Sequence, residues 1–278
     1  MPLIKNNAIL NIFFIKCFIK HYLTSTFIDV LHSPFVFNLY QTCIKKQNDK
    51  NELNEIEFCR NELLKDNKVI KYIDFGAGSN LLNNKINKKV KEIANSHLKP
   101  KRIAHIIYYI ILNFKVKNVI ELGTSLGITS SYIAQALKNN YKSNEVNFTT
   151  IEGVNEVKEI ANIQFKKLHL SDYIHSMEGN FNTELHEVLK KYKSVDVFFV
   201  DGNHTYEATM NYFNLALPYS HNDSIFIFDD IYWSKGMTKA WEEIKNNSKV
   251  LQTVDLFFIG LVLFRSEQKS QHFKLRVT

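Results

Sequence analysis

The sequence predicts an α/β fold: an open, mostly parallel sheet with helices on both faces and a helical extension at the N-terminus. From about residue 100 onward, short apolar runs alternate with stretches of helical period, which is the pattern of successive β–α units. Residues 195–200 (Val-Asp-Val-Phe-Phe-Val) are nearly all apolar, as a central parallel strand should be. The stretch Glu121-Leu-Gly-Thr-Ser-Leu-Gly127 then joins a strand to a helix through a tight glycine turn.

Residues 1 to about 65 are predicted to form helices, with a break at His32-Ser33-Pro34 because a residue before proline is pushed out of the helical region. The apolar run 8–19 is interrupted by Asn11 and Lys16 and is too short to span a membrane. We expect it to form an amphipathic helix that docks on the protein, with attachment to a membrane surface as the alternative. The face expected to dock carries Ile12, Ile15, Ile19 and Tyr22.

The parallel sheet is expected to contain seven strands. They are predicted at 117–122, 146–152, 173–178, 195–201, 224–230, 250–258 and 260–265. Helices are predicted at 103–114, 128–138, 156–168, 183–192, 205–217 and 234–246. The last two strands lie too close together for a crossover helix, so they should form an antiparallel pair at the sheet edge. We divide the chain into a mainly helical extension or cap, 1–95, and a second domain, 96–278.

The glycine turn after residue 122 indicates a nucleoside cofactor. The helix that follows it offers free N–H groups, and Glu152, which ends the next strand, can accept the ribose hydroxyls. A dinucleotide would require Gly-x-Gly-x-x-Gly, whereas the spacing here is Gly123-x-x-x-Gly127. Glu121 would repel a pyrophosphate but suits a cationic sulfonium with an amino group. This stretch resembles motif I of the class I S-adenosylmethionine-dependent methyltransferases.

The resemblance implies a Rossmann-like sheet and a set of cofactor-binding residues at the ends of its strands. Gly179, Asn180 and Phe181 follow the third strand, where this family contacts adenine. A competing glycine turn, 72–79, is followed by a Lys/Asn-rich stretch without a strand-ending acid, so we interpret it as a turn near the cofactor domain, with a role in lining the substrate pocket as the alternative. The predicted cofactor residues are Glu121, Gly123, Thr124, Ser125, Gly127, Thr129, Glu152, Gly153, Gly179, Asn180, Phe181 and Asp201.

Acidic residues also end the fourth and fifth strands, as Asp201 and as the pair Asp229-Asp230. Together with the motif Asp201-Gly-Asn-His204, they resemble the catechol and caffeoyl-CoA O-methyltransferase branch. In its metal-dependent members an Asp and an Asp-Asn pair hold Mg²⁺, which implies Asp201, Asp229 and Asp230 as metal ligands here. His204 stands at the offset of the family's general-base lysine and can take a hydroxyl proton. Asp230 in place of the family's Asn and His204 in place of its lysine leave open whether Mg²⁺ is needed. The predicted catalytic residues are His204 and Asp201.

The function that follows is transfer of a methyl group from S-adenosylmethionine to a hydroxyl of a small molecule, whose identity the sequence does not give. The alternatives are a basic-surface RNA or protein methyltransferase and a pseudo-enzyme that only binds the cofactor. Nucleic acid is the less favoured partner because the basic residues are scattered and no RNA-binding signature is present. Three cysteines without metal or redox spacing indicate a reducing, cytoplasmic location. A homodimer is left open.

Overall fold

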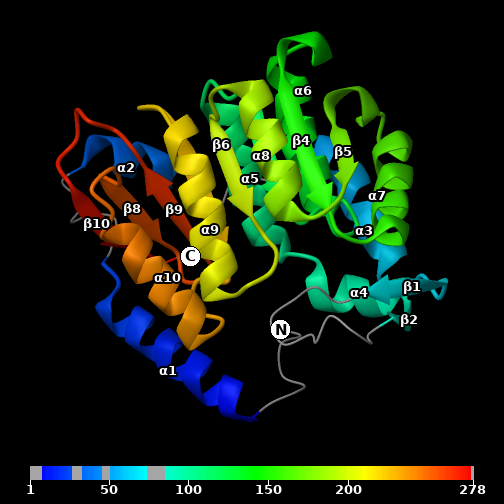
Figure 1. Ribbon diagram of the computed structural model, residues 1–278, viewed down its shortest axis with the longest axis horizontal. Coiled ribbons are helices and arrows are strands. Elements are labelled where there is room, and N and C mark those ends of the chain that lie inside the picture. The colour runs from blue at the N-terminus through cyan, green and yellow to red at the C-terminus, as the bar shows by residue number, and fades with distance from the viewer. Residues whose placement is uncertain (1–7, 27–32, 46–50, 74–84, 277–278) are drawn as a thin grey trace.

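The computed structural model describes residues 8–26, 33–45, 51–73 and 85–276 (Figure 1). Within these ranges, eight strands form one sheet in the order β10-β8-β9-β7-β6-β3-β4-β5. Only β9 runs antiparallel to its neighbours β7 and β8 among these described strands. The predicted α/β fold with its mostly parallel sheet is therefore confirmed. The difference lies at the edge, where β10 pairs in parallel with β8, outside the predicted strand pair.

The strands of the sheet are short and lie close to their predicted positions. They are β3 Asn118–Leu122, β4 Asn147–Glu152, β5 His175–Glu178, β6 Val197–Val200, β7 Ile225–Asp229, β8 Gln252–Asp255, β9 Ile259–Leu263 and β10 Gln271–Lys274. The helices that flank them are α5 Lys101–Asn113, α6 Ile128–Asn140, α7 Asn155–Lys167, α8 Phe181–Tyr192, α9 Tyr206–Ala216 and α10 Lys235–Lys245.

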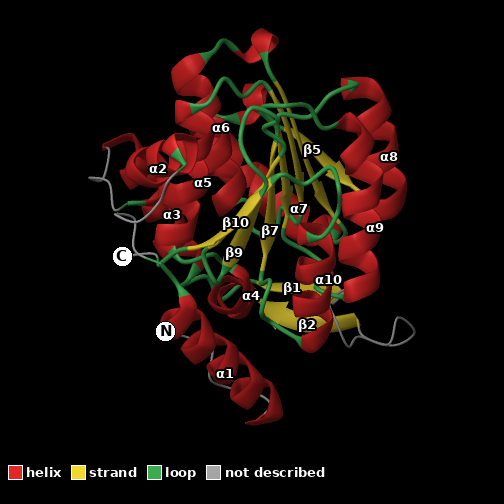
Figure 2. Cartoon of the chain, turned by 90° about the vertical axis from the view of Figure 1, so that its left-hand side faces the viewer, coloured by secondary structure: helices red, strands yellow, loops and turns green. Residues whose placement is uncertain are grey.

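Helices cover both faces of the sheet because successive side chains of a buried strand point in opposite directions. In β6, Val197 and Phe199 pack in the core formed with α5, α6 and α7. Phe198 and Val200 pack in the other core, with α8, α9 and α10. Figure 2 shows the sheet edge-on between α5 and α6 on one side and α8 and α9 on the other. The strand order reverses between β3 and β6, the point at which open α/β sheets bind ligands beyond the carboxyl ends of their strands.

The N-terminal segment combines helices with a small hairpin. Its helices are α1 Ala8–Thr24, α2 Pro34–Leu39, α3 Asn54–Leu63 and α4 Val90–His97, with a π-helical turn at Tyr40–Ile44 and a 3₁₀ turn at Asn51–Leu53. The strands β1 Val69–Ile73 and β2 Lys85–Lys89 pair antiparallel. The competing glycine turn falls largely in 74–84, outside the described residues. Helix α3 packs on α6, and β1 on α7. The division at residue 95 stays a prediction.

The sequence analysis assigned the wrong face of α1 to docking. Ile12, Ile15, Ile19 and Tyr22 are each more than half exposed. Phe14 packs instead against Phe257, with ring centroids 5.0 Å apart. His21 is buried and pairs with Asp255 of β8 at 3.1 Å. The residues that contact α1 lie on the loop between β8 and β9 and at the end of β8. The face of α1 that packs against them carries Phe14, Cys17 and His21.

Across the described parts of the chain, every helix falls short of the length and apolar character needed to cross a membrane.

Candidate active site

The glycine turn after β3 is shaped by contacts within the protein. Gly123 has a φ of +101°, and a Cβ at this position would lie 2.0 Å from the backbone oxygen of Asp201. Gly127 has a φ of +82°, and a Cβ there would press on Phe165 and Ala161 of α7. Both positions therefore require glycine because the loop packs tightly against neighbouring elements. This close packing brings the loop after β3 against the end of β6.

Glu121 lies fully buried near the end of β3 and keeps one carboxylate oxygen without a hydrogen-bond partner. Its Oε2 accepts hydrogen bonds from the hydroxyl of Thr150, at 2.7 Å, and from that of Ser130. Its Oε1 has no partner among the described residues. Burial raises the pKa of Glu121 to about 8, although the two hydroxyls oppose the shift. Buried polar atoms are nearly always paired, so Oε1 is suited to a donor supplied by a ligand.

Glu152, at the end of β4, holds the glycine turn in place. Its Oε2 accepts the backbone N–H of Ser125 at 2.8 Å, and its Oε1 accepts that of Val154 at 3.0 Å. Burial raises the pKa of this carboxyl group, against the opposing effect of these amide hydrogen bonds. A carboxylate has about four lone-pair positions, so both oxygens can still accept ribose hydroxyls.

The other residues of the predicted cofactor set surround these two carboxylates. Thr124 shares a hydroxyl hydrogen bond of 2.6 Å with Thr150. Thr129 is buried in the first turn of α6, and Gly153 follows directly after Glu152. The structure thus brings the residues that follow β3 and β4 together around one turn.

The segment Gly179-Asn180-Phe181 joins β5 to α8 and has structural partners of its own. The side-chain oxygen of Asn180 caps α8 by accepting the N–H of Asn182 at 2.9 Å. The ring of Phe181 lies against Gly202, where an added Cβ would be 2.6 Å away. Phe181 also meets Tyr212 edge-on, with centroids 6.0 Å apart. The ring therefore borders the loop after β6, next to Asp201, and the contact of Asn180 with adenine stays a prediction.

The acidic residues after β6 and β7 converge together with His204. One oxygen each of Asp201 and Asp229 and a ring nitrogen of His204 lie within 4.8 Å of one another. The Nε2 of His204 is 3.7 Å from Oδ1 of Asp201 and 4.0 Å from Oδ2 of Asp230. Asp230 has a φ of +53° and donates its N–H to the oxygen of Phe258 at 2.8 Å, which fixes the turn after β7. Asp201, His204, Asp229 and Asp230 thus form one acidic cluster.

Lys99 lies in the middle of this acidic cluster, and the sequence analysis did not find it. Its Nζ is 2.8 Å from Oδ1 of Asp201 and also contacts Oδ2 of Asp229. Burial by itself would lower the pKa of Lys99, but attraction by Asp201, Asp229 and Asp230 outweighs it and raises that pKa well above 10.5. Burial pushes the pKa of Asp229 upward, and Lys99 works against that shift. Lys99 is therefore an ammonium ion.

The predicted metal ligands fit a divalent cation by their chemistry but not by the space left for it. Carboxylate oxygens are the ligands that Mg²⁺ prefers. Here the oxygens of Asp201 and Asp229 that face each other already bind the ammonium group of Lys99. A metal ion between them would require Lys99 to leave.

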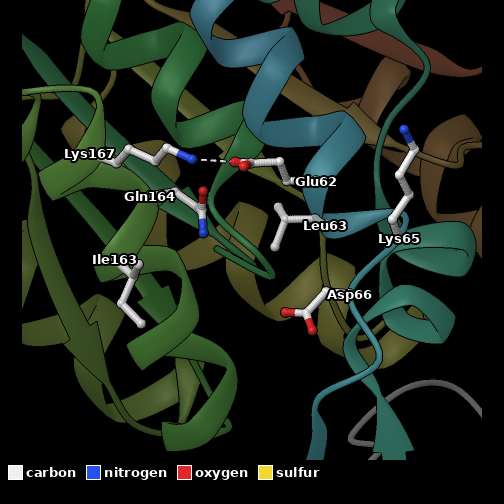
Figure 3. A pocket seen from close by; sticks show the side chains of 7 residues that line it. All are labelled: Glu62, Leu63, Lys65, Asp66, Ile163, Gln164 and Lys167. Atoms are coloured by element: carbon white, nitrogen blue, oxygen red, sulfur yellow. Dashed lines mark hydrogen bonds and ion pairs between the residues drawn. The ribbon is translucent and has the colours of Figure 1, made fainter.

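An open hollow on the described surface lies away from these residues. It has a volume of about 460 Å³ and lies between the end of α3 and the outer side of α7, where Lys167 and Glu62 form an ion pair (Figure 3). None of the predicted site residues lines it. The lining residues are Glu62, Leu63, Lys65, Asp66, Ile163, Gln164 and Lys167.

Comparison with known proteins agrees with this geometry. Residues 120–231 match the model of a methyltransferase domain family. No curated protein sequence matches the chain. Among solved structures, an O-methyltransferase from Bacillus cereus in complex with S-adenosylhomocysteine is 15% identical, with a TM-score of 0.54 over 85% of this chain and 100% of that one.

Two further structures show the same fold. The O-methyltransferase TomG from Streptomyces achromogenes, involved in tomaymycin synthesis and bound to S-adenosylmethionine, is 15% identical with a TM-score of 0.53, over 84% of this chain and 96% of that one. A Staphylococcus aureus protein provisionally assigned as a caffeoyl-CoA O-methyltransferase is 17% identical with a TM-score of 0.55, over 83% and 97%. The predicted resemblance to the class I S-adenosylmethionine-dependent methyltransferases is thus confirmed at two levels: residues 120–231 match a methyltransferase domain, and the chain has the fold of these solved methyltransferases.

Proposed function

We propose that the chain transfers the methyl group of S-adenosylmethionine to a hydroxyl oxygen of a small molecule. The observation that carries the proposal is Oε1 of Glu121, a fully buried carboxylate oxygen within the matched domain that has no hydrogen-bond partner in the described part of the chain. The amino group of the methionine part of the cofactor is a cationic donor that suits it. Glu152, one strand away, would hold the ribose. With the cofactor held in this way, its sulfonium methyl group would face the loops after β6 and β7.

The reaction needs a deprotonated acceptor oxygen near the sulfonium. The hydroxyl proton moves to Nε2 of His204, and the acceptor oxygen attacks the methyl carbon. Bound S-adenosylmethionine would supply the methyl group and leave as S-adenosylhomocysteine, the acceptor would become a methyl ether, and His204 would then return its proton to water. The protein supplies position and electrostatic stabilisation.

His204 is the candidate base because of its place and its access. Its side chain is 23% exposed, and Nε2 lies near two carboxylates. Asp201, whose Oδ1 lies 3.7 Å from Nε2 of His204, would touch both the acceptor and the cofactor.

The structural neighbours from Streptomyces achromogenes and Bacillus cereus are O-methyltransferases, which supports a hydroxyl group as the acceptor. Mg²⁺ assistance, a homodimer and a cytoplasmic location remain predictions of the sequence.

Isothermal titration calorimetry with S-adenosylmethionine tests the cofactor, with NAD as the negative control. Methyl transfer from radiolabelled cofactor to a panel of catechols, simple phenols and aliphatic alcohols then tests the reaction. We expect cofactor binding, no NAD binding, and a labelled product that His204→Ala suppresses. Binding without any labelled product from hydroxyl, RNA or protein acceptors would identify a pseudo-enzyme. A labelled RNA or protein would instead support the other alternative.

A further inference from the structure

The ammonium group of Lys99 joins two carboxylates that end neighbouring parallel strands. Asp201 follows β6 and Asp229 ends β7, and Nζ of Lys99 contacts one oxygen of each. The contact is shielded from water: the side chains of Lys99, Asp201 and Asp229 are 13%, 13% and 3% exposed. An ion pair in such surroundings is screened far less than one at the surface. The contact is therefore a fixed part of the site.

Lys99 reaches this position because its backbone is held from two sides. Pro100 follows it and disfavours the helical conformation at residue 99, and Leu98 before it is extended, so residues 98–100 separate α4 from α5. The carbonyl oxygen of Lys99 accepts a hydrogen bond of 2.7 Å from Nη1 of Arg60 in α3. Arg60 is fixed by Glu57 at 2.8 Å, and Glu57 accepts the hydroxyl of Tyr132 from α6 at 2.6 Å.

This anchoring has a chemical consequence for the acidic cluster. Three carboxylates close together repel one another unless a cation lies among them. Lys99 supplies that cation from the same chain, at an atom that the network Tyr132–Glu57–Arg60 keeps in place. A charge fixed before the reaction stabilises a developing oxyanion without rearrangement of its surroundings.

We propose that Lys99 is a built-in cation that takes the position of a divalent metal ion between Asp201 and Asp229, so that methyl transfer is independent of metal. The proposal rests on the proposed function, because Lys99 would stabilise the negative charge on the acceptor oxygen once His204 removes its proton. A divalent ion and the ammonium group cannot share the same two oxygens, since like charges at contact distance repel strongly.

The first test measures metal binding and needs no methyl acceptor. Mn²⁺ is titrated into the full chain and followed by electron paramagnetic resonance, for the wild type and for Lys99→Met. The wild type should bind no Mn²⁺ at millimolar concentration, whereas Lys99→Met should gain one site. Lys115→Met, the same change at an exposed lysine outside the cluster, should gain none. The double variant Lys99→Met/Asp229→Asn should lose the gained site.

The second test measures turnover. A chelator should leave wild-type methyl transfer unchanged, and Lys99→Met should lose about 10²-fold, the usual cost of removing one stabilising donor. Added Mg²⁺ should restore part of that loss in Lys99→Met, and Lys99→Arg should retain activity without metal. A merely structural lysine would show no rescue by Mg²⁺.

The wild type alone can overturn the proposal, even if Lys99→Met does not fold. Mn²⁺ bound to the wild type and lost in Asp201→Asn, or wild-type activity abolished by a chelator, would show that a metal displaces Lys99. Failure of the proposed function has a different signature: S-adenosylmethionine would not bind in calorimetry, whatever the Mn²⁺ titration shows.

Discussion

The hydroxyl of Thr150 in β4 donates a hydrogen bond of 2.7 Å to Oε2 of Glu121 in the neighbouring strand β3. This bond turns the carboxylate so that Oε2 is used inside the protein and Oε1 is left without a partner among the described residues. Because the side chain is fully buried, its charge state depends on what Oε1 meets.

Cofactor binding should therefore depend on pH. The pKa of Glu121 is raised to about 8, mainly by burial, so the free protein carries a neutral carboxyl group at neutral pH. Pairing with an amino cation requires the carboxylate, so binding should release a proton. The dissociation constant for S-adenosylmethionine should rise by up to about tenfold for each unit of pH below that pKa. Calorimetry in buffers of different ionisation enthalpy measures this release, and Glu121→Gln should bind weakly with a flat profile.

The carboxyl group of Glu121 should also make the free energy of unfolding depend on pH in the absence of ligand. Its pKa is about 8 when folded against 4.5 as the ordinary value, so the folded state binds the proton more tightly than the unfolded state. This contribution to the free energy of unfolding is complete at low pH and declines as the pH rises between those two values. Urea unfolding across this range should show the decline, and Glu121→Gln should lack that part of it. An identical pH profile for the two proteins would contradict the assigned shift.

Glu152→Ala should weaken cofactor binding by about 1–3 kcal/mol, the range for a charged hydrogen-bonding partner. It should also loosen the turn, because the N–H groups of Ser125 and Val154 lose their acceptor. Glu152→Gln keeps one oxygen and serves as the matched control, with thermal unfolding recorded for both. Unchanged affinity in a folded Glu152→Ala protein would remove the ribose assignment.

His204→Ala should lower the rate of methyl transfer about 10²–10⁴-fold if His204 is the base. The affinity for S-adenosylmethionine should stay nearly constant, because the imidazole lies beside Asp201 and Asp230 in the loops after β6 and β7 and has no contact with Glu121 or Glu152 among the described interactions. Single-turnover rates together with calorimetry separate the two effects. An equal loss in binding and in rate would make His204 a binding residue.

Helix α1 should be held by its aromatic contact with the loop between β8 and β9. Phe14→Ala removes the ring that packs on Phe257 and should cost the stabilisation of an aromatic pair, about 0.5–1.5 kcal/mol, in addition to that of the apolar area that the ring buries. Limited proteolysis should then cut α1 faster. Leu23→Ala is the control, because that side chain is 74% exposed on the same helix. Equal cleavage rates in the two variants would show that the contact does not hold the helix.

Much of this architecture could be predicted because its buried strands are apolar and its helices are amphipathic. The residues of β6 and β7 read directly as central strands, and they are buried throughout. In contrast, β10 was missed because Gln271–Lys274 is mostly polar and only Phe273 is buried. This strand pairs with β8 through backbone hydrogen bonds, and the pattern of side chains in the sequence does not reveal such pairing.

The acids of the site could be predicted since each ends a strand, and parallel strands bring their ends together. Lys99 could not, because it is one among 35 Lys and Arg residues and lies outside any strand–helix unit. The clue in the sequence was electrostatic: three clustered carboxylates require a cation. The face of α1 was misassigned for a similar reason, since its partners Phe257 and Asp255 are far away along the chain.

The contact between Lys99 and Asp229 spans 130 residues of sequence. Closing so long a loop costs conformational entropy that only later contacts repay, so such a pair forms late in folding. A chain emerging from the ribosome would carry Lys99 well before its carboxylate partners exist. Lys99, Asp201 and Asp229 should thus come together only after the sheet has formed through β7. The protein should therefore become active only when its fold is nearly complete.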